Sequence, residues 1–158
     1  MKKQILGILL LIAICTTLVS SNLPTHPGGF GFGLMLGKPS GICIEYWTKR
    51  EYSLLFTLTY YIDKKVGIRG DYLYHFYNVV EAPELSFFVG GGFAMEMWED
   101  PNVALQPVTQ VSFGVRIPGG AEYTIAPFHF CLYLAPRMDL YPATVPDLEG
   151  GLQFTFYP

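Results

Sequence analysis

The most constraining feature of this chain is a strict alternation of side-chain character, seen clearly in the stretch GIRGDYLYHFYN, residues 67–78. Successive side chains of a β-strand point to opposite faces. One face of this stretch carries Arg69, Asp71, Leu73, His75 and Tyr77. The other carries Ile68, Gly70, Tyr72, Tyr74 and Phe76. The alternation therefore predicts a strand with one charged face and one apolar, aromatic face.

The same alternation recurs along the chain from residue 29 onward, with no helical period. We interpret it as eight strands: 29–37, 41–49, 52–62, 66–80, 85–97, 108–117 with a possible extension to 125, 128–140 and 148–157. Short turns rich in glycine, proline and charge connect them, which favours an antiparallel up-and-down order. Pro118 removes a ladder donor, so we expect a bulge or a strand end near the rim there.

The N-terminal 21 residues have the composition of a secretory signal peptide. Lys2 and Lys3 precede an apolar run that ends at Cys15, and small residues lead up to Asn22. The run is shorter than the roughly 20 residues that a membrane-spanning helix needs. We predict a signal peptide over residues 1–21 and a single domain over residues 22–158, with lipoprotein processing at Cys15 as a less favoured alternative.

Alternating strands form either a soluble barrel with an apolar interior or a membrane barrel with an apolar exterior. Charged residues make up only 15% of the chain, against about 25% in ordinary soluble domains. Small residues populate the polar face, as a narrow filled interior requires. Aromatic residues gather near the strand ends, as at a membrane interface. We therefore predict an all-β, eight-stranded antiparallel transmembrane β-barrel.

Three blocks of the sequence carry a family resemblance: GFGLMLGKPSGICIEYW at 31–47, FGVRIPGGAEY at 113–123 and LAPRMDLYPATVPDLEGG at 134–151. The chain resembles a family of small bacterial outer-membrane β-barrels of unassigned function, which is similar to the eight-stranded transmembrane domain of the OmpA type. The resemblance implies the fold and a location in the bacterial outer membrane, and it implies no catalytic residue.

The polar residues on the predicted inner face are candidates for one structural network inside the barrel, because a buried charge needs a partner. These residues are Glu45, Arg69, Asp71, His75, Glu96, Arg116, Glu122 and Glu149. A gate or a proton path is the alternative to a structural plug. His75 shares a face with Asp71, but the sequence places no serine beside it, so we expect no catalytic, cofactor-binding or metal-binding residues and no cofactor.

The sequence thus predicts a non-enzymatic outer-membrane barrel with a structural or surface-interaction role. A narrow ion or solute channel is the second hypothesis, and a small-barrel membrane enzyme is the third. The expected partner is outer-membrane lipid, with external ligands at the loops 98–107 and 141–147 as a further option. A net charge of −3 without a basic run argues against nucleic acid, and we expect a monomer.

Overall fold

The structure is a computed structural model that describes residues 29–61, 65–77, 79–100 and 108–158. The predicted signal peptide lies outside these residues, as does most of the predicted loop 98–107. Among the described residues, no helix has the length and the apolar character needed to span a membrane.

Over the described residues the structure has nine strands. They are β1 (Gly29–Lys38), β2 (Ser40–Lys49), β3 (Tyr52–Tyr60), β4 (Val66–Phe76), β5 (Leu85–Asp100), β6 (Val108–Arg116), β7 (Gly119–Ile125), β8 (Phe128–Tyr141) and β9 (Val145–Phe156).

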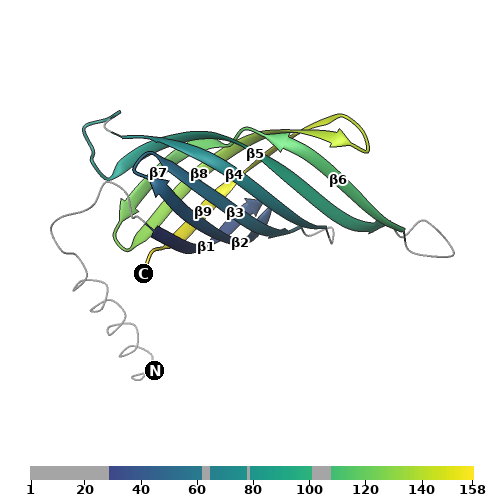
Figure 1. The fold of residues 1–158 in the computed structure, drawn as a ribbon, viewed down its shortest axis with the longest axis horizontal. Coiled ribbons are helices and arrows are strands. Elements are labelled where there is room, and N and C mark those ends of the chain that lie inside the picture. Colours follow the sequence, from purple (N-terminus) through teal and green to yellow (C-terminus); the bar gives the residue numbers. More distant parts are fainter. Residues whose placement is uncertain (1–28, 62–64, 78, 101–107) are drawn as a thin grey trace, which may run out of the picture.

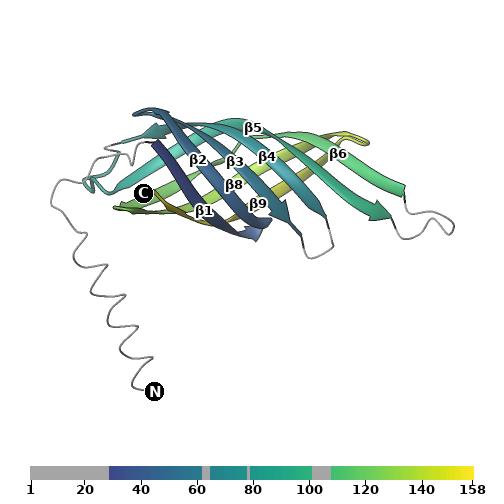
Figure 2. The ribbon, with the colours of Figure 1, turned by 60° about the horizontal axis from the view of Figure 1, so that its bottom comes forward.

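The strands close into a barrel in which every neighbouring pair is antiparallel (Figures 1 and 2). Strand β1 pairs with both β2 and β9, which closes the ring. Strands β6 and β7 follow one another along the same place in the wall, since both pair with β5 on one side and with β8 on the other. The ring therefore has eight positions, and the predicted eight-stranded antiparallel fold is confirmed.

The interruption at Pro118 lies within the wall and not at the rim, where the sequence placed it. Strand β5 pairs with Arg116 before the break and with Gly119 after it, so its 16 residues bridge the gap. The carbonyl of Pro118 accepts a hydrogen bond from the backbone of Gly90, and Ile117 donates to the carbonyl of Pro136. The missing donor of proline is tolerated there because both neighbouring strands stay bonded around it.

Strand β9 begins at Val145, three residues earlier than predicted. Residues 145–149 extend beyond the end of β1, whose last partner on β9 is Gly150. Pro146 therefore lies on a strand that is paired on one side, where a proline is tolerated. Strand β4 ends earlier than predicted, at Phe76 and not at Val80.

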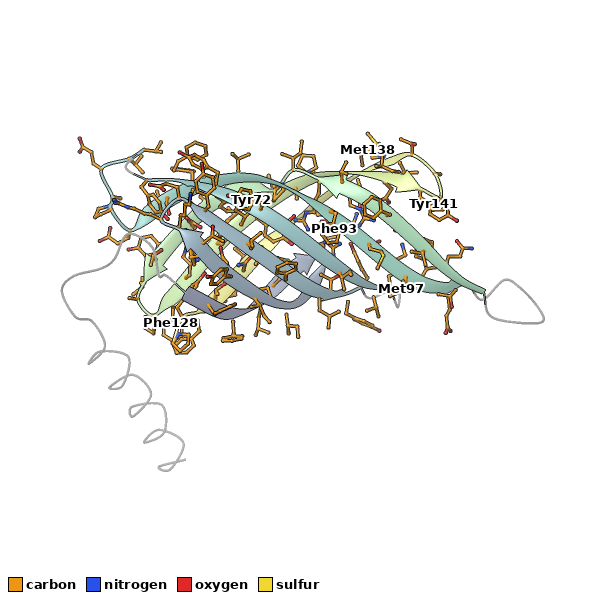
Figure 3. The ribbon with its side chains drawn as sticks, in the orientation of Figure 1. Tyr72, Phe93, Met97, Phe128, Met138 and Tyr141 are labelled. Carbon is orange, nitrogen blue, oxygen red and sulfur yellow. The ribbon has the colours of Figure 1, made fainter. Side chains whose placement is uncertain are left out.

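The side chains of the barrel are arranged inside out relative to a soluble domain. Tyr72, Phe93 and Phe128 are exposed on the outer surface, where Figure 3 labels them. Charged and small polar side chains are buried in the interior. We call the end of the barrel where β1 begins and β9 finishes the termini end, and the opposite end the far end (Figure 1).

Candidate functional site

The candidate site is the barrel interior, which the alternation of each strand builds. In β4, Arg69 is 1% exposed and the adjacent Ile68 is 40% exposed. All eight charged or polar residues singled out in the sequence are buried in this interior: Glu45, Arg69, Asp71, His75, Glu96, Arg116, Glu122 and Glu149. Among the described residues, the contacts of these side chains form two clusters, not the one network expected.

The first group, the far-end cluster, consists of Arg69, Arg137, Glu96 and Glu149. Nη2 of Arg69 donates to Glu149 at 2.7 Å and to Glu96 at 3.0 Å. Arg137 also bonds both carboxylates, with its Nη1 3.1 Å from Oε1 of Glu149. Two cations thus share two anions, and each buried charge has oppositely charged partners, which is the condition for holding charge in a low-dielectric interior.

Further hydrogen-bond partners complete the far-end cluster. Tyr61, just after β3, donates to Glu96 and accepts from Arg69. Arg137 donates further to Asp139 at 2.6 Å and to Ser112 at 3.3 Å. These contacts fix both guanidinium groups within the interior.

Arg116 and Asp71 are attached to the far-end cluster by charge and not by hydrogen bonds. Nε of Arg116 lies 3.4 Å from Asp71, and Nη1 lies 3.1 Å from Glu149. In the described residues, both oxygens of Asp71 and these two nitrogens have no hydrogen-bond partner. This pair is therefore the least satisfied part of the interior.

An apolar belt separates the far-end cluster from the termini end. Along β4 the inward residues run from Arg69 and Asp71 through Leu73 to His75. The belt consists of Met35, Cys43, Leu55, Leu73, Phe88, Cys131, Tyr133 and Ala135. Both cysteines of the belt, Cys43 and Cys131, are buried free thiols.

The second group, the termini-end cluster, is built around Glu45 and Glu122. Glu45 accepts hydrogen bonds from Ser53 and from Tyr157, each at 2.8 Å. Glu122 accepts from Ser86 at 2.7 Å and lies 2.7 Å from Nδ1 of His75. Trp47 and Tyr157 are buried at this end, and the indole of Trp47 donates to the hydroxyl of Tyr157.

His75 pairs with Glu122 and Ser53, not with Asp71 as the sequence hinted. Asp71 and His75 lie on opposite sides of Leu73 along β4, which accounts for the wrong pairing. Nε2 of His75 lies 2.8 Å from Oγ of Ser53, so serine, histidine and glutamate are aligned in order. The hydroxyl of Ser53 carries one proton and lies 2.8 Å from both Oε1 of Glu45 and Nε2 of His75. Serine, histidine and glutamate have the order of a catalytic triad, but Ser53 is 0% exposed, so its hydroxyl is closed to a substrate in this structure.

Several members of the clusters were not among the site residues predicted from the sequence: Ser53, Tyr61, Ser86, His129, Gln153 and Tyr157. Inward alternation could have identified Ser53 and Ser86, because each falls on the polar face of its strand. Across the barrel, however, the partner of each residue depends on the strand register. In the described ranges no group of three or more histidine, cysteine or carboxylate side chains is arranged to hold a metal ion.

Comparisons with known proteins support the fold assignment. No family model matches the chain, and no curated protein matches it. The structure is similar to the crystal structure of the N-terminal β-barrel domain of Pseudomonas aeruginosa OprF, with a TM-score of 0.61 and 18% sequence identity. The similarity covers 80% of this chain and 95% of that domain. In fold, the chain is thus an eight-stranded antiparallel barrel of the type seen in the OprF N-terminal domain.

Proposed function

We propose that this protein is an integral barrel of the bacterial outer membrane with a structural or surface-interaction role that involves no catalysis. The observation that carries the proposal is the wall of exposed apolar side chains around the barrel, among them Leu34, Ile42, Phe56, Tyr72 and Leu132. Contiguous exposed apolar surface of this extent marks contact with lipid or with another protein. A closed barrel satisfies all its backbone groups within the wall, as a membrane requires.

Strand lengths and aromatic positions support the same location. Strands β1 to β4 have 10, 10, 9 and 11 residues, and a tilted strand needs about 9–11 residues to cross a bilayer. Outward aromatic pairs gather at the termini end, including Phe30 with Tyr46 and Phe128 with Phe156, whose ring centroids lie 4.4 and 5.6 Å apart. Such a girdle is typical of the interface of membrane barrels.

The interior favours a plugged barrel over an open channel. The two charged clusters occupy the far end and the termini end, and the apolar belt lies between them. Eight strands enclose an interior just wide enough for side chains to fill. The large buried side chains Arg69, Phe88 and Tyr133 supply that filling.

Membrane fractionation combined with protease treatment of intact cells tests this proposal. We expect the protein in the outer-membrane fraction, released by detergent and not by salt. A protease site inserted at residues 142–144, at the far end, should be cut by protease added to intact cells. The same site at residues 50–51, at the termini end, should be protected. Recovery of the protein in the soluble periplasmic fraction would contradict the proposal.

A further inference from the structure

The apolar outer face of the barrel differs in length from strand to strand. On β2 it consists of three alternate residues with exposed side chains, Ile42, Ile44 and Tyr46. The next residues on the same face are polar, Ser40 at the far end and Thr48 at the termini end. On β8 the outer face is a longer series of alternate residues, all apolar and all exposed: Phe128, Phe130, Leu132, Leu134, Pro136, Met138 and Leu140.

The two series cover very different depths of a membrane. At about 3.3 Å per residue, the chain advances about 13 Å from Ile42 to Tyr46 and about 40 Å from Phe128 to Leu140. For strands tilted by about 45°, the depths along the barrel axis are about 9 Å and about 28 Å. The hydrocarbon core of a bilayer is about 30 Å thick. The face of β8 therefore matches the core, whereas the apolar face of β2 covers about a third of it.

The length of the outer face changes gradually around the ring, so the difference does not depend on one residue. On one side of β2, the outward apolar series runs over Phe30–Leu36 on β1 and Leu148–Phe156 on β9. On the other side it runs over Tyr52–Tyr60 on β3 and Val66–Phe76 on β4. At the far end, β1, β2 and β3 also stop short of β5, β6 and β8 in both views (Figures 1 and 2). The short face is thus a continuous sector of the wall centred on β2.

A tilt of the barrel cannot remove this difference. Tilting moves both boundaries of a face in the same direction relative to the membrane, so the length of the face is unchanged. Charge also marks the far boundary of the short face. Lys38 follows Leu36 on the outer side of β1, and its exposed ammonium pairs with Asp147 of β9 at 2.8 Å. An exposed ion pair belongs in the hydrated headgroup region and not in hydrocarbon.

We propose that the bilayer is locally thinned beside β1 and β2 and keeps its ordinary thickness beside β5 to β8. Lipid chains cover the short face, because it is continuous with the lipid-facing wall through β9 on one side and β3 on the other. A bilayer accommodates an apolar surface shorter than its core by thinning around it. This inference rests on the proposed membrane location.

Spin labels on the two faces test the proposal by their depth in vesicles of dioleoylphosphatidylcholine. Ser40→Cys and Thr48→Cys place labels at the two ends of the β2 face. Phe130→Cys and Met138→Cys, with the same spacing in sequence, are the matched pair on β8. Both native thiols are buried, so label added to the folded protein reacts with the introduced cysteine. We expect both β2 labels to collide mainly with a water-soluble nickel chelate and both β8 labels mainly with oxygen dissolved in the hydrocarbon core.

A label at Ile44→Cys, in the middle of the short face, checks that lipid covers it and should collide mainly with oxygen. Oxygen-dominated collisions at Ser40→Cys or Thr48→Cys would show a core of full thickness there and would overturn the proposal. Protection of the Ile44→Cys label from both reagents would also overturn it, because protein and not lipid would then cover the face. Failure of the membrane location looks different, since the β8 labels would then collide with the nickel chelate as well.

Discussion

At the scale of the single residue, the contribution of a charge to this barrel depends on whether it faces the interior. Arg69 is buried, and its guanidinium donates to Glu96, Glu149, Thr59 and Tyr61. The side chain of Lys38 is 60% exposed in its pair with Asp147. The interior ion pairs are therefore far more sensitive to the loss of one partner than the surface pair.

We predict that Arg69→Ala lowers the free energy of unfolding by about 3–5 kcal/mol, because it leaves Glu96 and Glu149 with less compensation in a buried site. Lys38→Ala should cost about 0–1 kcal/mol. Urea midpoints of the two variants, refolded in the same detergent, measure the difference. Equal midpoints would contradict the assignment of Arg69 to a buried cluster.

Two adjacent glycines test the inward and outward faces directly. A Cβ atom at Gly92 would lie 2.1 Å from a carboxylate oxygen of Asp71 and 2.4 Å from the carbonyl of Gly70. Gly91 points outward and has no atom within 4 Å of that position. Gly92→Ala should therefore destabilise the barrel by about 1–3 kcal/mol, and Gly91→Ala should stay within about 0.5 kcal/mol. A thermal or urea unfolding series checks both, and an inverted order would mean that the register of β5 is wrong.

At the scale of the strand, alternation predicted most of the fold but could not predict which strands lie opposite one another. The pattern of β4 identified the inward face of Arg69 and His75 correctly. It could not show that His75 meets Glu122 from β7, since that contact depends on the tilt and register of the whole ring. The break between β6 and β7 was predicted from Pro118, but its position within the wall depends on the length of β5.

The closing strand β9 offers a test at this scale. Its inward series continues beyond the strand to Tyr157, whose hydroxyl accepts from Trp47 and donates to Glu45. Tyr157→Phe removes both bonds at a buried site and should cost about 1–3 kcal/mol. It should also change the fluorescence of Trp47, because its indole N–H loses its acceptor. Tyr141→Phe, at a 62% exposed position, is the matched control and should leave both properties unchanged.

At the scale of the whole molecule, the interior is divided along the barrel axis into a charged far end, an apolar belt and a charged termini end. In this order, the side chains of the apolar belt lie between the two polar clusters, and none of them carries a charge. An ion that enters from either end loses its water at the belt without gaining a charged partner. We expect the belt to block conduction, whereas the charged clusters link the strands at the two ends.

We therefore predict that the refolded wild-type protein produces no stable conductance steps in a planar bilayer. The double variant Leu55→Ser/Phe88→Ser makes the belt smaller and polar, and it should produce steps that the wild type lacks. Leu58→Ser, on the outward face of β3, is the control for a polar substitution that leaves the belt intact, and it should remain silent. Stable ion-selective steps in the wild type that disappear on substitution of Arg69 or Arg116 would instead make the charged clusters part of a conducting path. In that case the protein would be a narrow channel and not a plugged barrel, with the belt as a gate that opens within the folded barrel.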